Sequence, residues 1–263
     1  MRIVRLANFV APRSGGLRTA MRALGRGYLA AGHEPVLVVP GRYPADEWTD
    51  QGRVITVPGP VLPLSGGYRV LVNRPRLAAL LEELAPDRLE VSDRTTLRWT
   101  GAWARRRGIP AVMVSHESVA GLLGLAARAP WTGRLADVLN HRTARHYQRV
   151  VCTTGWAAAE FERIGATNLA RVPLGVDLNT FSPSRYSPAV RRRYARDEEA
   201  LLVHCGRLSV EKRPERSLDA IAALTATGLP AVLVVAGDGP LRARLQRRAA
   251  DLPVRFAGFV GGR

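Results

Sequence analysis

A strand, a turn and the start of a helix occupy residues 201–225, and this stretch constrains the fold more than any other. Leu201-Leu202-Val203 is an apolar run of the kind found in buried strands. Pro214 suits the first position of a helix, because proline lacks the N–H that would be unpaired there. Four later side chains share one helical face: Leu218, Ile221, Ala222 and Thr225. Such units build open α/β sheets, whose ligands bind at the turn between strand and helix.

The turn itself carries two cations. Gly206 lets the backbone approach a ligand, Arg207 can bind a diphosphate through two parallel hydrogen bonds, and Lys212 adds a point charge. The helix N-terminus adds partial positive charge. Of the 39 Lys and Arg residues only Lys212 is lysine, so this position departs from a strong preference for arginine. We therefore predict a diphosphate site, with a solvated surface turn as the alternative.

The same pattern recurs along the chain and predicts a doubly wound parallel sheet. Continuous apolar runs indicate strands covered on both faces. Strand-like runs occupy residues 3–7, 35–39, 53–57, 88–91, 111–114, 150–154, 169–173, 231–235 and 254–256. Residues 40–52 and 58–73 are rich in proline, glycine and charge, and we expect loops there. Trp99 and Trp103 lie four residues apart in a helix expected over 95–107, which is typical of core residues.

Composition limits the classes of partner and compartment. The net charge of +17 indicates an anionic partner, such as nucleotide phosphates or a membrane surface. No helix-turn-helix, zinc-finger or RNA-recognition pattern is present, so nucleic acid is not expected. No apolar run reaches the ~18 residues of a membrane span, and the chain begins with a strand, so we expect a cytoplasmic protein without a signal peptide. Cys152 and Cys205 lie in strand-like runs and are expected to be buried free thiols.

Polar residues follow several predicted strands, at the edge where ligands of such sheets bind. Asp93 either orients a substrate hydroxyl or caps the next helix. His116 either hydrogen-bonds a ligand hydroxyl near neutral pH, or caps a helix or lies in the core. Gly15-Gly16 either lines a ligand or forms an ordinary tight turn, and the same two readings apply to Gly237-Asp238-Gly239.

Two basic segments could contact an anionic acceptor or a membrane. Arg13 and Arg18 flank the first glycine pair. Residues 121–149 mix leucine and tryptophan with arginine, which suits a membrane-surface patch as well as a solvated helix. His141 and His146 in this segment are spaced poorly for a metal pair, and we expect no metal.

Four stretches occur in a recognisable order. They are Gly15-Gly16, Pro173-Leu174-Gly175-Val176-Asp177, Gly206-Arg207-Leu208-Ser209-Val210-Glu211-Lys212 and Val235-Ala236-Gly237-Asp238-Gly239-Pro240. Together they resemble the motifs of retaining, nucleotide-sugar-dependent glycosyltransferases of family 4, which have the GT-B fold. The resemblance extends over nearly the whole chain.

This resemblance implies an α/β protein with two Rossmann-like domains that face a cleft. The acceptor-side domain would occupy residues 1–173, a linker 174–197, and an incomplete nucleotide-sugar-binding domain 198–263. A hexose would pass from a nucleotide diphosphate sugar to an acceptor hydroxyl with retention of configuration, without metal or cofactor. GDP-mannose is the first expected donor, by likeness to actinobacterial mannosyltransferases, and UDP-glucose the second. The acceptor would be a carbohydrate or a glycolipid.

The resemblance also assigns roles to residues. Arg207 and Lys212 would stabilise the leaving diphosphate, with Gly15 and Gly16 beside it, and His116 would hold the donor sugar. The turn of Gly237, Asp238 and Gly239 would lie next to the nucleotide. The acceptor side would contain Arg13, Arg18 and Asp93.

The sequence departs from the family near its end. Family members carry a Glu-x7-Glu element that holds the donor, whereas no Glu follows Glu215 here. We therefore expect a C-terminally truncated enzyme with weakened donor binding, and three alternatives remain open. The chain could be a non-catalytic nucleotide-binding relative, a basic module that binds membranes or anions, or an epimerase- or phosphorylase-like GT-B enzyme.

Overall fold

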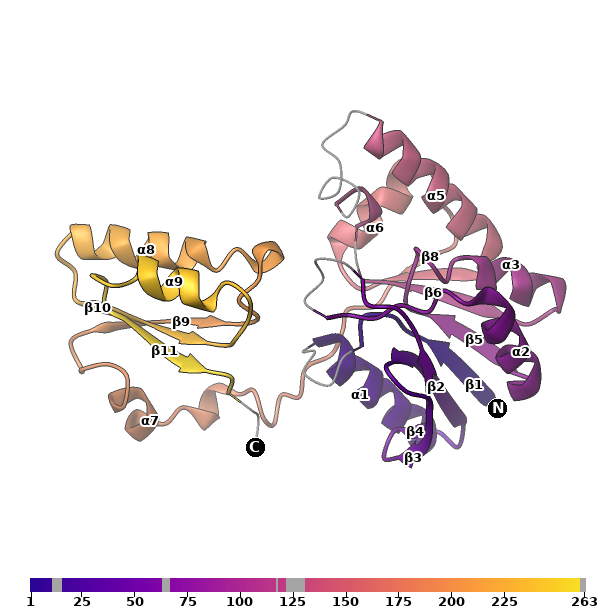
Figure 1. Cartoon of the computed structure of the whole chain (residues 1–263), viewed down its shortest axis with the longest axis horizontal. Coiled ribbons are helices and arrows are strands. Elements are labelled where there is room, and N and C mark those ends of the chain that lie inside the picture. Colours follow the sequence, from indigo (N-terminus) through magenta and orange to yellow (C-terminus); the bar gives the residue numbers. More distant parts are fainter. Residues whose placement is uncertain (11–15, 63–66, 117, 122–130, 261–263) are drawn as a thin grey trace. The chain divides into compact units, whose positions relative to one another are not determined.

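The computed structural model describes residues 1–10, 16–62, 67–116, 118–121 and 131–260. Contacts within the chain divide it into two units, Met1–Gly175 and Val176–Arg263 (Figure 1). Most of the segment expected to be a linker, from residue 176 onward, thus belongs to the second unit. It contains a short 3-10 helix, η1 (Pro183–Arg185), and the short helix α7 (Pro188–Arg192).

An eight-stranded sheet runs through the described part of the first unit, in the order β3-β4-β2-β1-β5-β6-β7-β8. The strands are β1 (Arg2–Leu6), β2 (Glu34–Gly41), β3 (Ala45–Thr49), β4 (Gly52–Pro58), β5 (Arg88–Val91), β6 (Ala111–Ser115), β7 (Arg149–Cys152) and β8 (Leu169–Arg171). Neighbouring strands pair in parallel except β3 and β4, which are antiparallel. The order reverses beside β1, which pairs with both β2 and β5, so the predicted doubly wound sheet is confirmed.

Strand β3 corrects the expectation of a loop over residues 40–52. It lies at the edge of the sheet, and four of its five residues are exposed, so it lacks the apolar run that would announce a buried strand. Its pairing is supported by an ion pair across the hairpin, in which Arg53 Nη2 lies 2.7 Å from Asp46 Oδ2. A charged, exposed outer strand also discourages pairing with a second chain.

Helices cover both faces of this sheet. Alternate side chains of β2 point to opposite faces: Leu37 and Val39 pack with α1 (Gly16–Ala30), whereas Val36 and Val38 join the core under α2 (Arg74–Leu84). That larger core also includes side chains of α3 (Trp99–Arg106) and α6 (Gly155–Arg163). Helix α5 (Thr132–His146) contacts α3 and α6. The continuous apolar runs are thus explained by burial on two sides.

Helix α3 begins at Trp99 rather than at residue 95 as expected. The carboxylate of Asp93 accepts hydrogen bonds from the backbone N–H groups of Thr95 and Leu97, which holds this segment in a separate turn. The interpretation of the two tryptophans as core residues is confirmed, because Trp103 is buried and Trp99 packs against the same cluster.

The second unit contains, in its described residues, a three-stranded parallel sheet in the order β11-β10-β9. Its strands are β9 (Ala200–Cys205), β10 (Ala231–Ala236) and β11 (Val254–Gly258), at the three predicted positions. Helices α8 (Glu215–Ala226) and α9 (Arg242–Arg248) pack on one face through Leu218, Ile221 and Leu245 (Figure 1). A 3-10 turn, η2 (Val210–Lys212), precedes α8.

The two cysteines differ in exposure. Cys152 is buried as expected, but Cys205 is exposed, which corrects the second half of that expectation. The reason is the position of Cys205 on β9, an outer strand of the small sheet. His204 faces α8 and hydrogen-bonds Ser217 at 2.9 Å, so its neighbours Val203 and Cys205 face the other way, where Val203 is 61% exposed.

Candidate active site

The carboxyl ends of β1, β5 and β6 bring together the polar residues of the first unit. These strands are neighbours in the sheet. His116 directly follows β6, and Asn8 and Asp93 come one residue later after β1 and β5. Because the strand order reverses between β2 and β5, this edge is the topological switch point, where doubly wound sheets bind ligands. Helix α1 begins here at Gly16.

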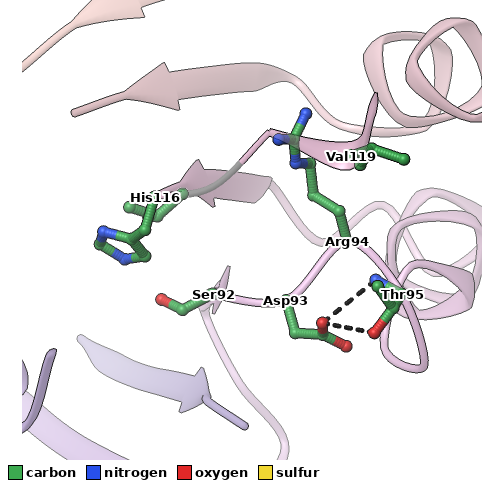
Figure 2. Close-up of a pocket in the computed structure, with 7 residues that line it drawn as sticks. Ser92, Asp93, Arg94, Thr95, His116 and Val119 are labelled. Atoms are coloured by element: carbon green, nitrogen blue, oxygen red, sulfur yellow. Dashed lines mark hydrogen bonds between the residues drawn. The ribbon is translucent and has the colours of Figure 1, made fainter. Parts of the chain in front are cut away.

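A small pocket opens at this edge (Figure 2). Its volume is about 10 Å³, on the order of the space that one water molecule needs. The walls come from the loop after β5, from the end of β6 and from the loop that follows β6. The lining residues are Ser92, Asp93, Arg94, Thr95, Val114, His116 and Val119.

His116 presents an uncharged imidazole to this pocket. The ring is partly buried, and neither Nδ1 nor Nε2 has a hydrogen-bond partner among the described residues. Burial lowers the pKa of His116 below 6.5, Glu90 raises it in part, and Arg94 lowers it further. A neutral imidazole offers one donor and one acceptor, which suits the hydroxyl of a sugar.

Asp93 has both carboxylate oxygens occupied by the protein. Oδ1 accepts from Thr95 N at 3.1 Å and Thr95 Oγ1 at 2.6 Å, and Oδ2 accepts from Leu97 N at 3.0 Å and Asn8 Nδ2 at 3.1 Å (Figure 2 shows the Thr95 bonds). Asn8 also accepts from Leu71 N at 2.8 Å and so joins three loops. This geometry favours the capping role for Asp93 over the orientation of a substrate.

Glu160 fixes the loop that follows His116. Its buried carboxylate accepts hydrogen bonds from Ser118 Oγ at 2.6 Å, Ala120 N at 2.9 Å and Val119 N at 3.0 Å. It also lies 3.4 Å from the guanidinium of Arg94, a pocket residue. Burial opposes the charge, but these hydrogen bonds and Arg94 together lower the pKa of Glu160. One carboxylate on α6 thus ties together the loops after β5 and β6.

A second buried ion pair anchors α1, which covers the other face of the large sheet from α6. Arg5 Nε lies 3.3 Å from Glu90 Oε1, and its Nη1 donates to the carbonyl oxygen of Met21 at 2.9 Å. The hydroxyl of Tyr28 donates to Glu90 Oε2 at 2.8 Å. Two strands and a helix therefore share one hydrogen-bond network, which fixes the start of α1 relative to the edge of the sheet.

The predicted residues near Gly16 are only partly described. Gly16 is the first residue of α1, and Arg18 is exposed in its first turn. A Cβ added at Gly16 would meet no atom of the described residues within 4 Å. Arg13, Gly15 and Glu117 lie outside the described residues.

In the second unit, the predicted diphosphate turn follows β9. Arg207 is partly buried and Lys212 is exposed at the end of η2, ahead of α8. Gly206 has space around it, because a Cβ there would meet only His204 Nε2 at 3.9 Å. The backbone at Gly206 is therefore open to a close approach.

The turn after β10 packs directly against this one. Gly206 N donates to Ala236 O, and Leu208 N donates to Asp238 O, both at 3.0 Å. A Cβ at Gly237 would collide with the carbonyl oxygen of Gly206, and one at Gly239 would lie 2.5 Å from Leu208 O. Both glycines also have positive φ angles. The two predicted turns thus form one surface, whose backbone contact requires glycine.

Asp238 is exposed, and its carboxylate stabilises the turn in which it lies. Its Oδ1 accepts from Gly239 N at 2.8 Å, and its Oδ2 lies 3.4 Å from Arg242 on α9.

Across the described ranges, no group of three or more His, Cys, Asp and Glu side chains is placed to hold a metal ion. None of the described helices has the length and apolar character to cross a membrane.

Sequence reasoning missed Ser92, Asn8, Arg94 and Glu160. Only Glu160 left a usable signal: it lies at helical spacing with Ala157 and Phe161, a buried face on which a lone carboxylate must have a partner. The others depend on which loops the fold brings together, and nothing local in the sequence marks them.

Two families match the chain. Residues 15–175 match the family described as "Glycosyl transferase 4-like domain", and residues 188–262 match "Glycosyl transferases group 1". A protein of Mycobacterium tuberculosis (strain ATCC 25177 / H37Ra), named GDP-mannose-dependent alpha-(1-6)-phosphatidylinositol dimannoside mannosyltransferase, is 52% identical over 264 aligned residues. The alignment covers 100% of this chain and 69% of the relative. A GDP-mannose-dependent alpha-mannosyltransferase of Mycolicibacterium smegmatis is 29% identical, over 94% of this chain and 65% of the relative.

The fold of the chain is also similar to that of solved glycosyltransferase structures. HepE of Anabaena, in complex with UDP, matches with a TM-score of 0.70 at 18% identity, over 99% of this chain and 70% of that one. Sucrose-phosphate synthase of Thermosynechococcus elongatus matches with a TM-score of 0.70 at 16% identity, over 98% and 70%. The chain therefore belongs to the group 1 glycosyltransferases, with a family-4-like first domain and the GT-B fold.

Proposed function

We propose that this glycosyltransferase moves a mannosyl group from GDP-mannose to a hydroxyl of a phosphatidylinositol mannoside. One observation carries the proposal: the chain is 52% identical, along its whole length, to a relative named for this donor and this class of acceptor. The solved structures that contain UDP are below 20% identical, so they bear on the fold and not on the donor.

The second unit supplies the electrostatics for a departing diphosphate. Arg207 and Lys212 lie on the turn between β9 and α8, where the helix N-terminus adds partial positive charge. Two cations can take the place of a metal ion, and we include metal independence in the proposal. Loss of one such contact raises a reaction barrier by ~2–4 kcal/mol.

We also propose that the transfer retains the configuration of the mannose. Asp93 is the one carboxylate that lines the described pocket, and both of its oxygens accept hydrogen bonds from the protein. It is therefore poorly placed to act as a nucleophile. The acceptor oxygen would bond to the anomeric carbon on the same face that the diphosphate leaves, as the bond to the diphosphate breaks. Its proton would pass to a released phosphate oxygen, so the configuration would be retained without a protein nucleophile.

Calorimetric titration with GDP and with UDP tests the donor site. We expect the wild-type chain to bind GDP more tightly than UDP, and Lys212→Ala to weaken GDP binding about ten- to hundred-fold. Arg244→Ala is the matched control, since Arg244 is an exposed cation on α9 of the same unit. Equal affinity of Lys212→Ala and Arg244→Ala would contradict a diphosphate role for Lys212.

A transfer assay tests the reaction. Labelled GDP-mannose is incubated with phosphatidylinositol dimannoside, and the anomeric configuration of the product is read by NMR. We expect an α-linked product and an unchanged rate in the presence of a chelator. A β-linked product would contradict retention, and loss of activity in the chelator would contradict metal independence.

Helix α5 offers a surface for a lipid acceptor, and we propose a cytoplasmic enzyme that contacts the inner face of an anionic membrane. Trp131, Leu135 and Val138 are exposed at positions that share one helical face with Arg142. Its opposite face is buried through Ala136, Asn140 and Thr143. Flotation with anionic vesicles tests this: Leu135→Glu should reduce binding, and high salt should weaken it. The part of the predicted patch at residues 122–130 lies outside the described residues.

A further inference from the structure

Three polar atoms at the pocket beside His116 are buried without a partner in the described part of the chain. They are Nδ1 and Nε2 of His116 and the hydroxyl oxygen of Ser92. Ser92 is only 8% exposed. The two residues follow the neighbouring strands β5 and β6, and in Figure 2 the Ser92 hydroxyl and the His116 ring lie on the same side of the pocket.

The polar neighbours of these atoms are engaged elsewhere. The Asp93 carboxylate accepts from Thr95, Leu97 and Asn8. The guanidinium of Arg94 donates to Asn140 at 3.0 Å and pairs with Glu160. Buried polar groups in native proteins are normally paired, so a group of unpaired ones calls for an explanation.

We infer that Ser92 is a substrate-binding residue, and that Ser92 and His116 together bind an alcohol group of a substrate. The Ser92 hydroxyl and a neutral imidazole can each donate and accept a hydrogen bond, as an alcohol can. Val114 and Val119 give the pocket apolar walls. The charge of Arg94 is balanced by Glu160, so an anion gains little here. This inference rests on the proposed transfer reaction, because it assigns a contact within that reaction.

Such an alcohol has two possible sources, the donor sugar and the acceptor. Steady-state kinetics of Ser92→Ala separate them, with GDP-mannose varied at fixed phosphatidylinositol dimannoside and then the reverse. We expect KM for one of the two substrates to rise about ten-fold, the loss typical of one hydrogen bond. The substrate whose KM rises is the one that contacts Ser92.

The stability of the ligand-free protein distinguishes binding from a structural role. Because the Ser92 hydroxyl has no hydrogen-bond partner among the described residues, its removal should leave the Tm unchanged or raise it. Thr143→Val is the matched control: Thr143 is also buried, but its hydroxyl donates to Leu139 O at 3.0 Å, so this change should lower the Tm. The Thr143 variant should keep its KM values, since Thr143 lies on α5, away from the pocket-lining set.

Two outcomes overturn the inference. One is a Ser92→Ala protein with a lowered Tm, which would show that the hydroxyl has a structural partner. The other is a stable Ser92→Ala protein whose two KM values equal those of the wild type. If the wild-type chain transfers no mannose, the proposed function fails, and the thermal comparison still decides whether the Ser92 hydroxyl is unpaired.

Discussion

Arg94 and Glu160 form an ion pair of 3.4 Å in the interior of the first unit, with their side chains 4% and 6% exposed. Arg94 follows β5 and Glu160 lies on α6, after β7, so the pair spans three strands of the sheet. The guanidinium also stacks over the ring of Phe161, 5.0 Å from its centroid. Arg94 also lines the pocket that contains His116, so the pair couples the shape of that pocket to the packing of α6.

Replacement of Glu160 by alanine should destabilise the protein strongly. The change leaves the Arg94 charge buried and removes the acceptor for the N–H groups of Val119 and Ala120. We expect a loss of ~3–5 kcal/mol in the free energy of unfolding, as for other broken buried pairs. Urea unfolding followed by circular dichroism measures it.

The neighbouring helices supply the control for this prediction. Asp137 on α5 pairs with Arg163 on α6 at the surface. Asp137→Ala should therefore cost less than ~1 kcal/mol. Similar losses in the two variants would mean that the buried pair contributes no more than an exposed one.

The titration of His116 should be shifted toward acid. Burial lowers its pKa in the folded state below 6.5, so the unfolded state binds more protons between the folded pKa and 6.5. Stability from this group is complete above pH 6.5 and is lost as the pH falls toward the folded pKa. NMR titration of the His116 ring, assigned by comparison with His116→Gln, measures the pKa. A value at or above 6.5 would refute the buried, neutral imidazole.

Gly237→Ala should damage the second unit. Its new methyl group would collide with the carbonyl oxygen of Gly206, and the φ of +154° is unfavourable for alanine. We expect a loss of at least ~1–3 kcal/mol, because both backbone strain and the collision contribute. Gly206→Ala is the control for the free energy of unfolding, because a methyl group at Gly206 would have space. Thermal unfolding of the two variants should rank Gly237→Ala as the less stable.

Asp93→Ala decides between the two readings of that residue. If Asp93 caps the turn, the variant loses the bonds to Thr95 and Leu97 and should be destabilised by ~0.5–2 kcal/mol. If Asp93 instead orients a substrate, the variant should keep its Tm and show a raised KM for the acceptor. We expect the first result, and differential scanning fluorimetry with acceptor kinetics separates the two.

Much of the fold could be predicted from the sequence, because a strand that is buried on both faces of its sheet has a continuous run of apolar residues. Residues 35–39 and 231–235 predicted β2 and β10 in this way. The turns that contain Gly206 and Gly237 were also predictable, since glycine at such a place reports a close backbone approach. Strand β3 could not be predicted, because its pattern is set by pairing at the edge and not by burial.

The pocket was predictable only in part. Asp93 and His116 could be placed because each lies just after the end of a strand, which is a local property of the sequence. The partners of a buried polar group are set by tertiary contacts instead: Glu160 bonds Ser118, 42 residues away, and Asn8 bonds Asp93, 85 residues away. The exposure of Cys205 was likewise beyond the sequence, since it depends on which strand lies outermost.

The contact between Gly206 and Gly237 has a consequence for how this protein can change over time. Backbone atoms form it, so no side-chain substitution on one turn can compensate for a bulkier residue on the other. The geometry of the turn that contains Arg207 therefore depends on the lack of a side chain at Gly237, which belongs to a different strand and helix unit. A larger residue at Gly237 would displace the backbone beside Arg207.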